Sequence, residues 1–180
     1  MEEYSPVRYT VEERRYLLMM KWIKRLCSLI LLCLLIAGGI LLFQGYREYR
    51  EALSGKSVEE MARQIESIDN YTSLDELPQT YIDAVLAVED KRFYEHPGID
   101  PIAIGRALLN DIRAGEYVEG GSTITQQLAK NQYFTQEKRL VRKVAEMFMA
   151  FKIEAELDKD KILELYVNSI YFGNGYQCVG

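Results

Sequence analysis

The sequence has little of what metal and disulfide sites require. Its only histidine is His96, and its acidic residues show no recognisable ligand spacing, so no metal site is predicted from the residues alone. Two of its three cysteines, Cys27 and Cys33, lie in an apolar run, and Cys178 lies almost at the C-terminus. This distribution indicates no disulfide framework. Repeats and low-complexity tracts are also absent.

An excess of positive charge is missing as well. The chain has 22 Lys and Arg against 27 Asp and Glu, with a formal net charge of −5. Nucleic-acid binding requires a basic face that contacts phosphates, so we expect no nucleic acid among the partners. With 180 residues, 48% of them hydrophobic, the chain can form one globular core with accessory segments, and it is not disordered.

One uncharged run, "LCSLILLCLLIAGGILLF" at residues 26–43, is long enough to cross a bilayer as a helix. Lys21, Lys24 and Arg25 precede it, which places the N-terminus in the cytoplasm. A cleaved signal peptide is the alternative, but the run exceeds a usual h-region and no clear cleavage site follows. The predicted organisation is a cytoplasmic segment (1–25), a transmembrane helix (26–43), an extracytoplasmic stalk (44–70) and a globular domain (71–180).

The globular domain is predicted to be all-α, because its long segments show helical spacing and strand-like alternation is scarce. In the stalk, Ser57 and Glu60 have the spacing of a capping box that starts a short helix. The predicted apolar face of the helix near 140–157 is Leu140, Val144, Met147, Phe148, Phe151 and Ala155. That of the helix near 159–172 is Ile162, Leu163, Tyr166 and Ile170, with Lys159 solvated.

Glu89 stands out within "YIDAVLAVEDKRFYEH". It shares a predicted helix face with Ile82, Val85 and Leu86, so we expect partial desolvation to raise its pKa toward the range of a general base. Asp90, one step round the helix, is expected to be better solvated. The alternative is an ordinary solvated charge pair at a helix end. His96, which precedes Pro97-Gly98, is expected to be a turn residue that bonds to nearby backbone.

The segment "GGSTITQQLAKN" at 120–131 joins a Gly-Gly turn to an amphipathic helix. Thr123 with Gln126 fits a capping box, or Ser122 caps one residue earlier. Free N–H groups at such a helix start attract anions, and Lys130 follows two turns later. The alternative is an ordinary capped helix, since Walker-loop spacing is absent.

These segments, together with "EDKRFYEHPG", "RKVAE" and "KDKILELYVN", resemble the peptidoglycan glycosyltransferase family (glycosyltransferase family 51) over residues 71–180. The resemblance implies a mainly helical, lysozyme-like fold anchored in the bacterial cell membrane, with its cleft at the outer surface. Such enzymes polymerise lipid II into glycan strands and release undecaprenyl diphosphate. It also implies other cell-wall synthesis proteins as partners, and leaves Mg²⁺ or Mn²⁺ open as a cofactor. The family continues beyond Gly180, so the domain is expected to be C-terminally incomplete.

By matched position, the resemblance makes Glu89 the catalytic base and Glu146 the second catalytic acidic residue. Lys130 and Lys138 match positions that stabilise the diphosphate, although many members have Arg at the latter. The remaining matched substrate-binding positions are Asp90, Phe93, His96, Gly121, Ser122, Thr123, Gln126, Gln127, Asn131, Arg142 and Lys143. Those matched as mainly structural are Glu164, Tyr166 and Asn168.

Two other hypotheses stay open at this point. A membrane-anchored muramidase would use Glu89 as a general acid, but it requires a second carboxylate across the cleft. It has no use for Lys130 or for the Gly-Gly turn. An inactive, truncated membrane protein that contributes only binding is the non-enzymatic alternative.

Overall fold

The computed structural model describes residues 10–116, 120–135, 137 and 139–170, except the side chains of residues 11, 13 and 14. All regular structure in these ranges is helical, without a strand, which confirms the all-α prediction. The long helices are α1 (Val11–Gly55), α2 (Val58–Glu66), α3 (Gln79–Glu89), α4 (Pro101–Ala114), α5 (Ile124–Tyr133), α6 (Leu140–Glu156) and α7 (Lys159–Ser169). Two short 3₁₀ turns are η1 (Leu74–Glu76) and η2 (Phe93–Glu95).

The chain divides into two compact units, residues 1–41 and residues 42–180. The first unit contains most of α1, whose large apolar side chains are exposed along its length. In the described residues, one helical stretch, Arg15–Gly55, is long and apolar enough to cross a membrane, with a mean hydropathy of 2.9 in its most apolar window. The helix therefore continues on both sides of the predicted span at 26–43.

The second unit starts with the last turns of α1, which pack on α6. The rings of Tyr46 and Tyr49 lie 5.5 and 5.9 Å from that of Phe148. Ser57 then caps α2 by accepting from the Glu60 amide at 3.1 Å, as the capping box predicted. The apolar face of α2 is buried in the core. Much of the segment 44–70 is therefore part of the domain and not a free stalk. Its apolar residues recur at helical spacing, which gives α2 the face that it buries.

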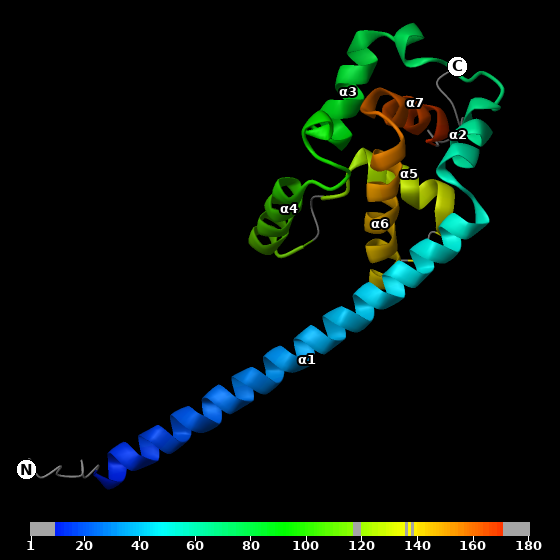
Figure 1. The fold of residues 1–180 in the computed structure, drawn as a ribbon. Coiled ribbons are helices and arrows are strands. Elements are labelled where there is room, and N and C mark those ends of the chain that lie inside the picture. The colour runs from blue at the N-terminus through cyan, green and yellow to red at the C-terminus, as the bar shows by residue number, and fades with distance from the viewer. Residues whose placement is uncertain (1–9, 117–119, 136, 138, 171–180) are drawn as a thin grey trace, which may run out of the picture. The chain divides into compact units, whose positions relative to one another are not determined.

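Helices α5, α6 and α7 lie against one another at the centre of the domain (Figure 1). Their shared core includes Leu128 of α5, Met149 and Ile153 of α6, and Ile162 and Leu165 of α7. Asp158 caps α7 by accepting from the Lys161 amide at 2.8 Å. The predicted face of α7 is confirmed for its buried residues Ile162, Leu163 and Tyr166.

The predicted face of α6 is wrong. Leu140 is 75% exposed and Phe151 46% exposed, whereas the face toward the core carries Ala145, Met149 and Ile153. Two charged residues, Arg142 and Glu146, are buried on that same side. The apolar pattern missed this face because part of it is an ion pair, which hydrophobic periodicity does not register.

Helix α4 lies to one side of this central group (Figure 1). Asp100 caps it by accepting from the amides of Ile102 at 2.9 Å and Ala103 at 3.1 Å, with Pro101 in its first turn. Gly115 ends it in a left-handed conformation, with φ of 70°. The end of α3, the start of α4 and the Gly-Gly segment before α5 lie close together, and residues of all three surround one cavity.

Candidate active site

A cavity of about 500 Å³ lies between these three segments. Glu89 lines it at the end of α3, and residues 120–123 line it before α5. Three cationic side chains, Lys91, Arg92 and Arg106, complete much of its wall. The cavity therefore combines one exposed carboxylate with several positive charges.

Glu89 is the last residue of α3, and its side chain is exposed. Its Oε2 accepts a hydrogen bond from Gln127 Nε2 at 2.9 Å. Gln127 Oε1 in turn accepts from the Tyr166 hydroxyl at 3.2 Å. Burial, and then the nearby charge of Glu89, raise the pKa of Tyr166, so its hydroxyl stays a donor and turns the Gln127 amide group toward Glu89.

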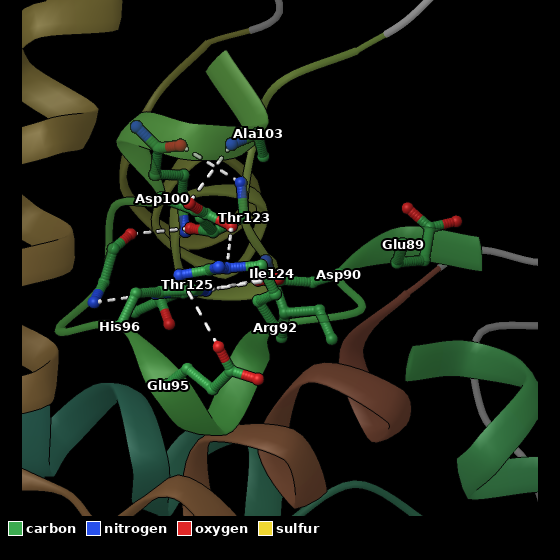
Figure 2. Close-up of polar contacts among 12 residues, drawn as sticks. Glu89, Asp90, Arg92, Glu95, His96, Asp100, Ala103, Thr123, Ile124 and Thr125 are labelled. Atoms are coloured by element: carbon green, nitrogen blue, oxygen red, sulfur yellow. Dashed lines mark hydrogen bonds and ion pairs between the residues drawn. The ribbon is translucent and has the colours of Figure 1, made fainter. Parts of the chain in front are cut away.

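The predicted burial of Glu89 and solvation of Asp90 are both wrong. Because α3 ends at Glu89, the chain leaves the helix there and carries the next side chain inward. Asp90 is buried, and its carboxylate lies 2.9 Å from His96 Nε2 and 3.1 Å from the Ile124 amide nitrogen. Figure 2 shows this network, with Glu89 lying apart from it.

His96 bonds to nearby backbone, as predicted, and holds Asp90 as well. Its Nδ1 accepts from the Gly98 amide at 3.2 Å, which makes Nε2 the protonated nitrogen that donates to Asp90. Gly98 has a φ of +97°, and its carbonyl accepts from Thr123 Oγ1 at 2.6 Å. The loop after Glu89 is therefore tied to the start of α5 at two points.

Asp100 anchors the far end of the same loop. Arg92 Nε lies 3.1 Å from its Oδ2. Burial alone raises the pKa of Asp100, but amide hydrogen bonds from Ala103 and Ile102 and the charge of Arg92 outweigh it and lower the pKa. Asp100 thus stays ionised and holds Arg92 at the cavity wall.

The start of α5 is capped by Thr123, which forms the predicted capping box with Gln126 in both directions. The Ile124 amide donates to Asp90, and the Gln126 amide donates to Thr123 Oγ1. These two N–H groups are therefore bound by the protein itself. For these two groups the structure fits the alternative of an ordinary capped helix, because Asp90 is already the anion at this helix start.

A second charged cluster reaches the cavity from α6. Glu146 is 1% exposed and accepts hydrogen bonds from Arg142 and, at 3.0 Å, from Lys143 Nζ. Lys143 Nζ also donates to Ser122 Oγ at 2.7 Å. Ser122 lines the cavity, whereas Glu146 is not among the described lining residues. Glu146 is therefore connected to the cavity wall through Lys143.

Several predicted site residues lie elsewhere. Phe93 is buried in the core, and Gln126 is buried as part of the cap. Asn131 lines a separate cavity of about 300 Å³ between α2, α5 and α7. Lys130 is half-buried on α5 and is not among the described residues that line the main cavity. Lys138 lies outside the described residues.

Three lining residues were not predicted from the sequence: Lys91, Arg92 and Arg106. The first two were visible beside Glu89, but nothing in their spacing distinguished them from surface charges. Arg106 lies on α4, a helix for which no functional pattern was recognised. Among the described residues, no group of three or more His, Cys, Asp or Glu side chains is placed to hold a metal ion.

Comparison with known proteins agrees with the family resemblance seen in the sequence. The family model described as "Transglycosylase" matches residues 54–180. The chain is 54% identical over 103 residues to penicillin-binding protein 1F of Bacillus subtilis, covering 57% of this chain and 14% of that protein. It is 54% identical over 105 residues to penicillin-binding protein 1A of Aquifex aeolicus, with 58% and 14% covered. It is 43% identical over 153 residues to penicillin-binding protein 1A of Haemophilus influenzae, with 81% and 18% covered. The chain thus spans less than a fifth of the length of these relatives.

Proposed function

Since the chain belongs to the transglycosylase family, whose model matches most of its length, we propose that it is a peptidoglycan glycosyltransferase of bacterial cell-wall synthesis. Its substrate is lipid II, and its product is a glycan strand with release of undecaprenyl diphosphate. The observation that carries the proposal is the exposed Glu89 carboxylate in a cavity with cationic walls. A diphosphate leaving group and an acceptor hydroxyl require these two features together.

In the proposed step, the 4-hydroxyl of one sugar attacks C1 of the other, and Glu89 accepts the hydroxyl proton. The new C1–O4 bond forms as the bond between C1 and the diphosphate breaks, and the diphosphate leaves with the electron pair. One attack inverts the α-linked donor to a β-linked product. Gln127 holds the carboxylate in place through its 2.9 Å hydrogen bond, which orients it for proton transfer.

The cations supply the complementary charge. Lys91, Arg92 and Arg106 line the cavity, and Lys143 reaches Ser122 at its edge. A guanidinium binds a phosphate through two parallel hydrogen bonds, and charge held in place stabilises a departing diphosphate. We assign these four side chains to the diphosphates, with Lys130 and Lys138 retained on family resemblance alone.

A muramidase is the less favoured function. It requires a second carboxylate that is free to act on the other face of the sugar. Apart from Glu89, the carboxylates among the described lining residues are Asp90 and Asp100. Both are buried, and both are bound by the protein's own amides. Neither is placed to act as nucleophile or base, which favours transfer over hydrolysis.

The apolar segment of α1 fits a lipid-borne substrate. We propose that it crosses the cytoplasmic membrane once, with the N-terminus in the cytoplasm and the second unit outside. The basic residues Lys21, Lys24 and Arg25 before the apolar run favour this orientation. Other cell-wall synthesis proteins are the partners that we propose on the same family grounds.

The test uses lipid II in detergent or vesicles and measures glycan strands and released undecaprenyl diphosphate. Glu89→Gln is expected to abolish strand formation while binding of a non-polymerisable lipid II analogue persists, since glutamine cannot accept the proton. The matched control is Asp83→Asn, which lies on the same helix, is exposed and also accepts a glutamine amide, from Gln79 at 2.9 Å. Strand formation by Glu89→Gln at the wild-type rate, or hydrolysis of preformed glycan by the wild type, would contradict the proposal.

A further inference from the structure

A partly buried charged cluster lies behind the loop that follows Glu89, and its residues are not among those that line the cavity. Its centre is Lys159, the first residue of α7, which was expected to be solvated. Its side chain is 20% exposed, and that of its partner Glu154 on α6 is 9% exposed. The Lys159 ammonium lies 2.7 Å from Glu154 Oε1, so the two charges neutralise each other.

Lys159 holds the loop directly. Its Nζ donates to the His96 carbonyl oxygen at 2.7 Å and lies 4.3 Å from the centre of the Phe93 ring. Both contacted residues lie in the segment between Glu89 and Gly98: Phe93 contributes its ring and His96 its backbone carbonyl. A single ammonium group therefore fixes both η2 and the residue that holds Asp90.

Glu154 connects the same ammonium to α5 and to the loop turn. Its Oε1 accepts from Thr125 Oγ1 at 2.6 Å, in the first turn of the helix that bears Gln127. At Gly98, an added Cβ would lie 3.1 Å from Glu154 Cγ and 3.2 Å from the Ala150 carbonyl oxygen. The loop thus packs directly on α6 at the position of Glu154, with no room for a side chain at Gly98.

We propose that Lys159 and Glu154 are positioning residues for the transferase reaction, which set the loop 90–98 and the start of α5 so that Glu89 and Gln127 meet. This inference rests on the proposed function. Among the described residues, Gln127 of α5 is the side chain that donates to Glu89, so the place of Glu89 depends on how α5 and the loop are joined. Lys159 and Glu154 are the charged pair that contacts both.

The test compares Lys159→Met with Lys161→Met in the membrane-embedded protein. Lys161 is a close match on the same helix, because it also forms ion pairs, with Glu164 and Glu66 at 2.6 Å each, and lies over an aromatic ring, that of Tyr71. It anchors a different segment, through the Tyr71 hydroxyl at 3.0 Å. Lys159→Met loses the ion pair with Glu154, and Lys161→Met loses those with Glu66 and Glu164, so both variants are expected to lower thermal stability, Lys161→Met at least as much as Lys159→Met.

Turnover of lipid II separates the two variants. Lys159→Met is expected to lower kcat about 10- to 100-fold with a much smaller change in KM, because a small displacement of the base affects the chemical step. Lys161→Met is expected to stay within about 2- to 3-fold of wild type. Lys159→Arg, which keeps the charge and can donate to both acceptors, is expected to recover most of kcat.

Amide hydrogen exchange gives a readout that needs no activity. In Lys159→Met, the Gly98 and Ile124 amides, which donate to His96 and Asp90, are expected to exchange faster than in Lys161→Met. Equal kcat or equal exchange in the two variants would overturn the inference. A wild type that forms no glycan would refute the proposed function instead, and exchange alone would then decide the role of Lys159.

Discussion

Asp90→Asn and Glu89→Gln are adjacent, conservative changes for which the structure predicts opposite effects. Asp90 is buried, and its carboxylate accepts from His96 Nε2 and from the Ile124 amide at the start of α5. Glu89 is exposed and accepts a hydrogen bond from Gln127. We therefore expect Asp90→Asn to lower stability and Glu89→Gln to lower activity without lowering stability.

The size of the Asp90 effect follows from its contacts. Oδ2 lies 2.9 Å from His96 Nε2 and 3.1 Å from the Ile124 nitrogen, and Oδ1 lies 3.1 Å from the same histidine nitrogen. Asparagine keeps one oxygen but turns an NH₂ toward the histidine N–H, and it removes a negative charge from a helix start. Charge-assisted hydrogen bonds are worth about 1.5–3 kcal/mol each, and the charge at the helix start about 0.3–1 kcal/mol. We expect a loss of about 2–4 kcal/mol.

Thermal unfolding followed by circular dichroism measures this difference. A loss of about 2–4 kcal/mol lowers Tm by roughly 4–16 °C in a chain of this size. Glu89→Gln removes one exposed interaction and is expected to change stability by less than about 1 kcal/mol. Were Glu89→Gln to lower Tm more than Asp90→Asn, the burial that distinguishes the two carboxylates, and the assignment of Glu89 as the free base, would both be refuted.

Three further outcomes are expected. Removing residues 1–43 is expected to leave the helical content of the second unit intact, whereas removing 1–55 also deletes Tyr46 and Tyr49 and should lower its Tm, as circular dichroism would show. Asp100→Asn is expected to lower stability at neutral pH, and by less as pH falls below about 3.9. A carboxyl whose pKa is lowered on folding stabilises above its unfolded pKa of about 3.9, and that contribution is lost as pH falls through the folded pKa; melts across pH 2–7 test this. Glu146→Gln is expected to lower the free energy of unfolding by about 3–5 kcal/mol, because it leaves Arg142 buried without its counter-charge. A loss of under about 1 kcal/mol in a denaturant titration would contradict this.

Local patterns predicted several elements correctly. The Thr123–Gln126 and Ser57–Glu60 spacings gave true helix starts, because a cap is completed within four residues. The apolar periodicity of α7 gave its buried face, since that face is mostly aliphatic. The buried face of α6 mixes apolar residues with the charged Arg142 and Glu146. For that helix, apolar periodicity therefore selected a face that is partly exposed.

The errors at the site have a different origin. The helical pattern was extended through Glu89 and Asp90, so Glu89 was expected to be the buried residue and Asp90 the solvated one. The reverse holds, because α3 ends at Glu89 and the next residue is no longer helical. Helix ends are the least certain feature of any pattern. Lys159 was expected to be solvated for a related reason, since its two acceptors, Glu154 and the His96 carbonyl, are not visible in the spacing of α7.

Two of the charged groups that hold the loop after Glu89 share one property that explains both the errors and the site. Asp90 binds the amide of Ile124, and Lys159 binds the carbonyl of His96, so each joins segments far apart in the sequence. A buried charge needs such partners to offset its desolvation, and while they hold it, it is not free to act as a base. Glu89 differs because it stays exposed, with Gln127 as its side-chain partner in the part of the chain that the structure describes. These bound charges therefore fix the loop, and we propose that the accessible carboxylate of Glu89 next to them exchanges a proton with substrate.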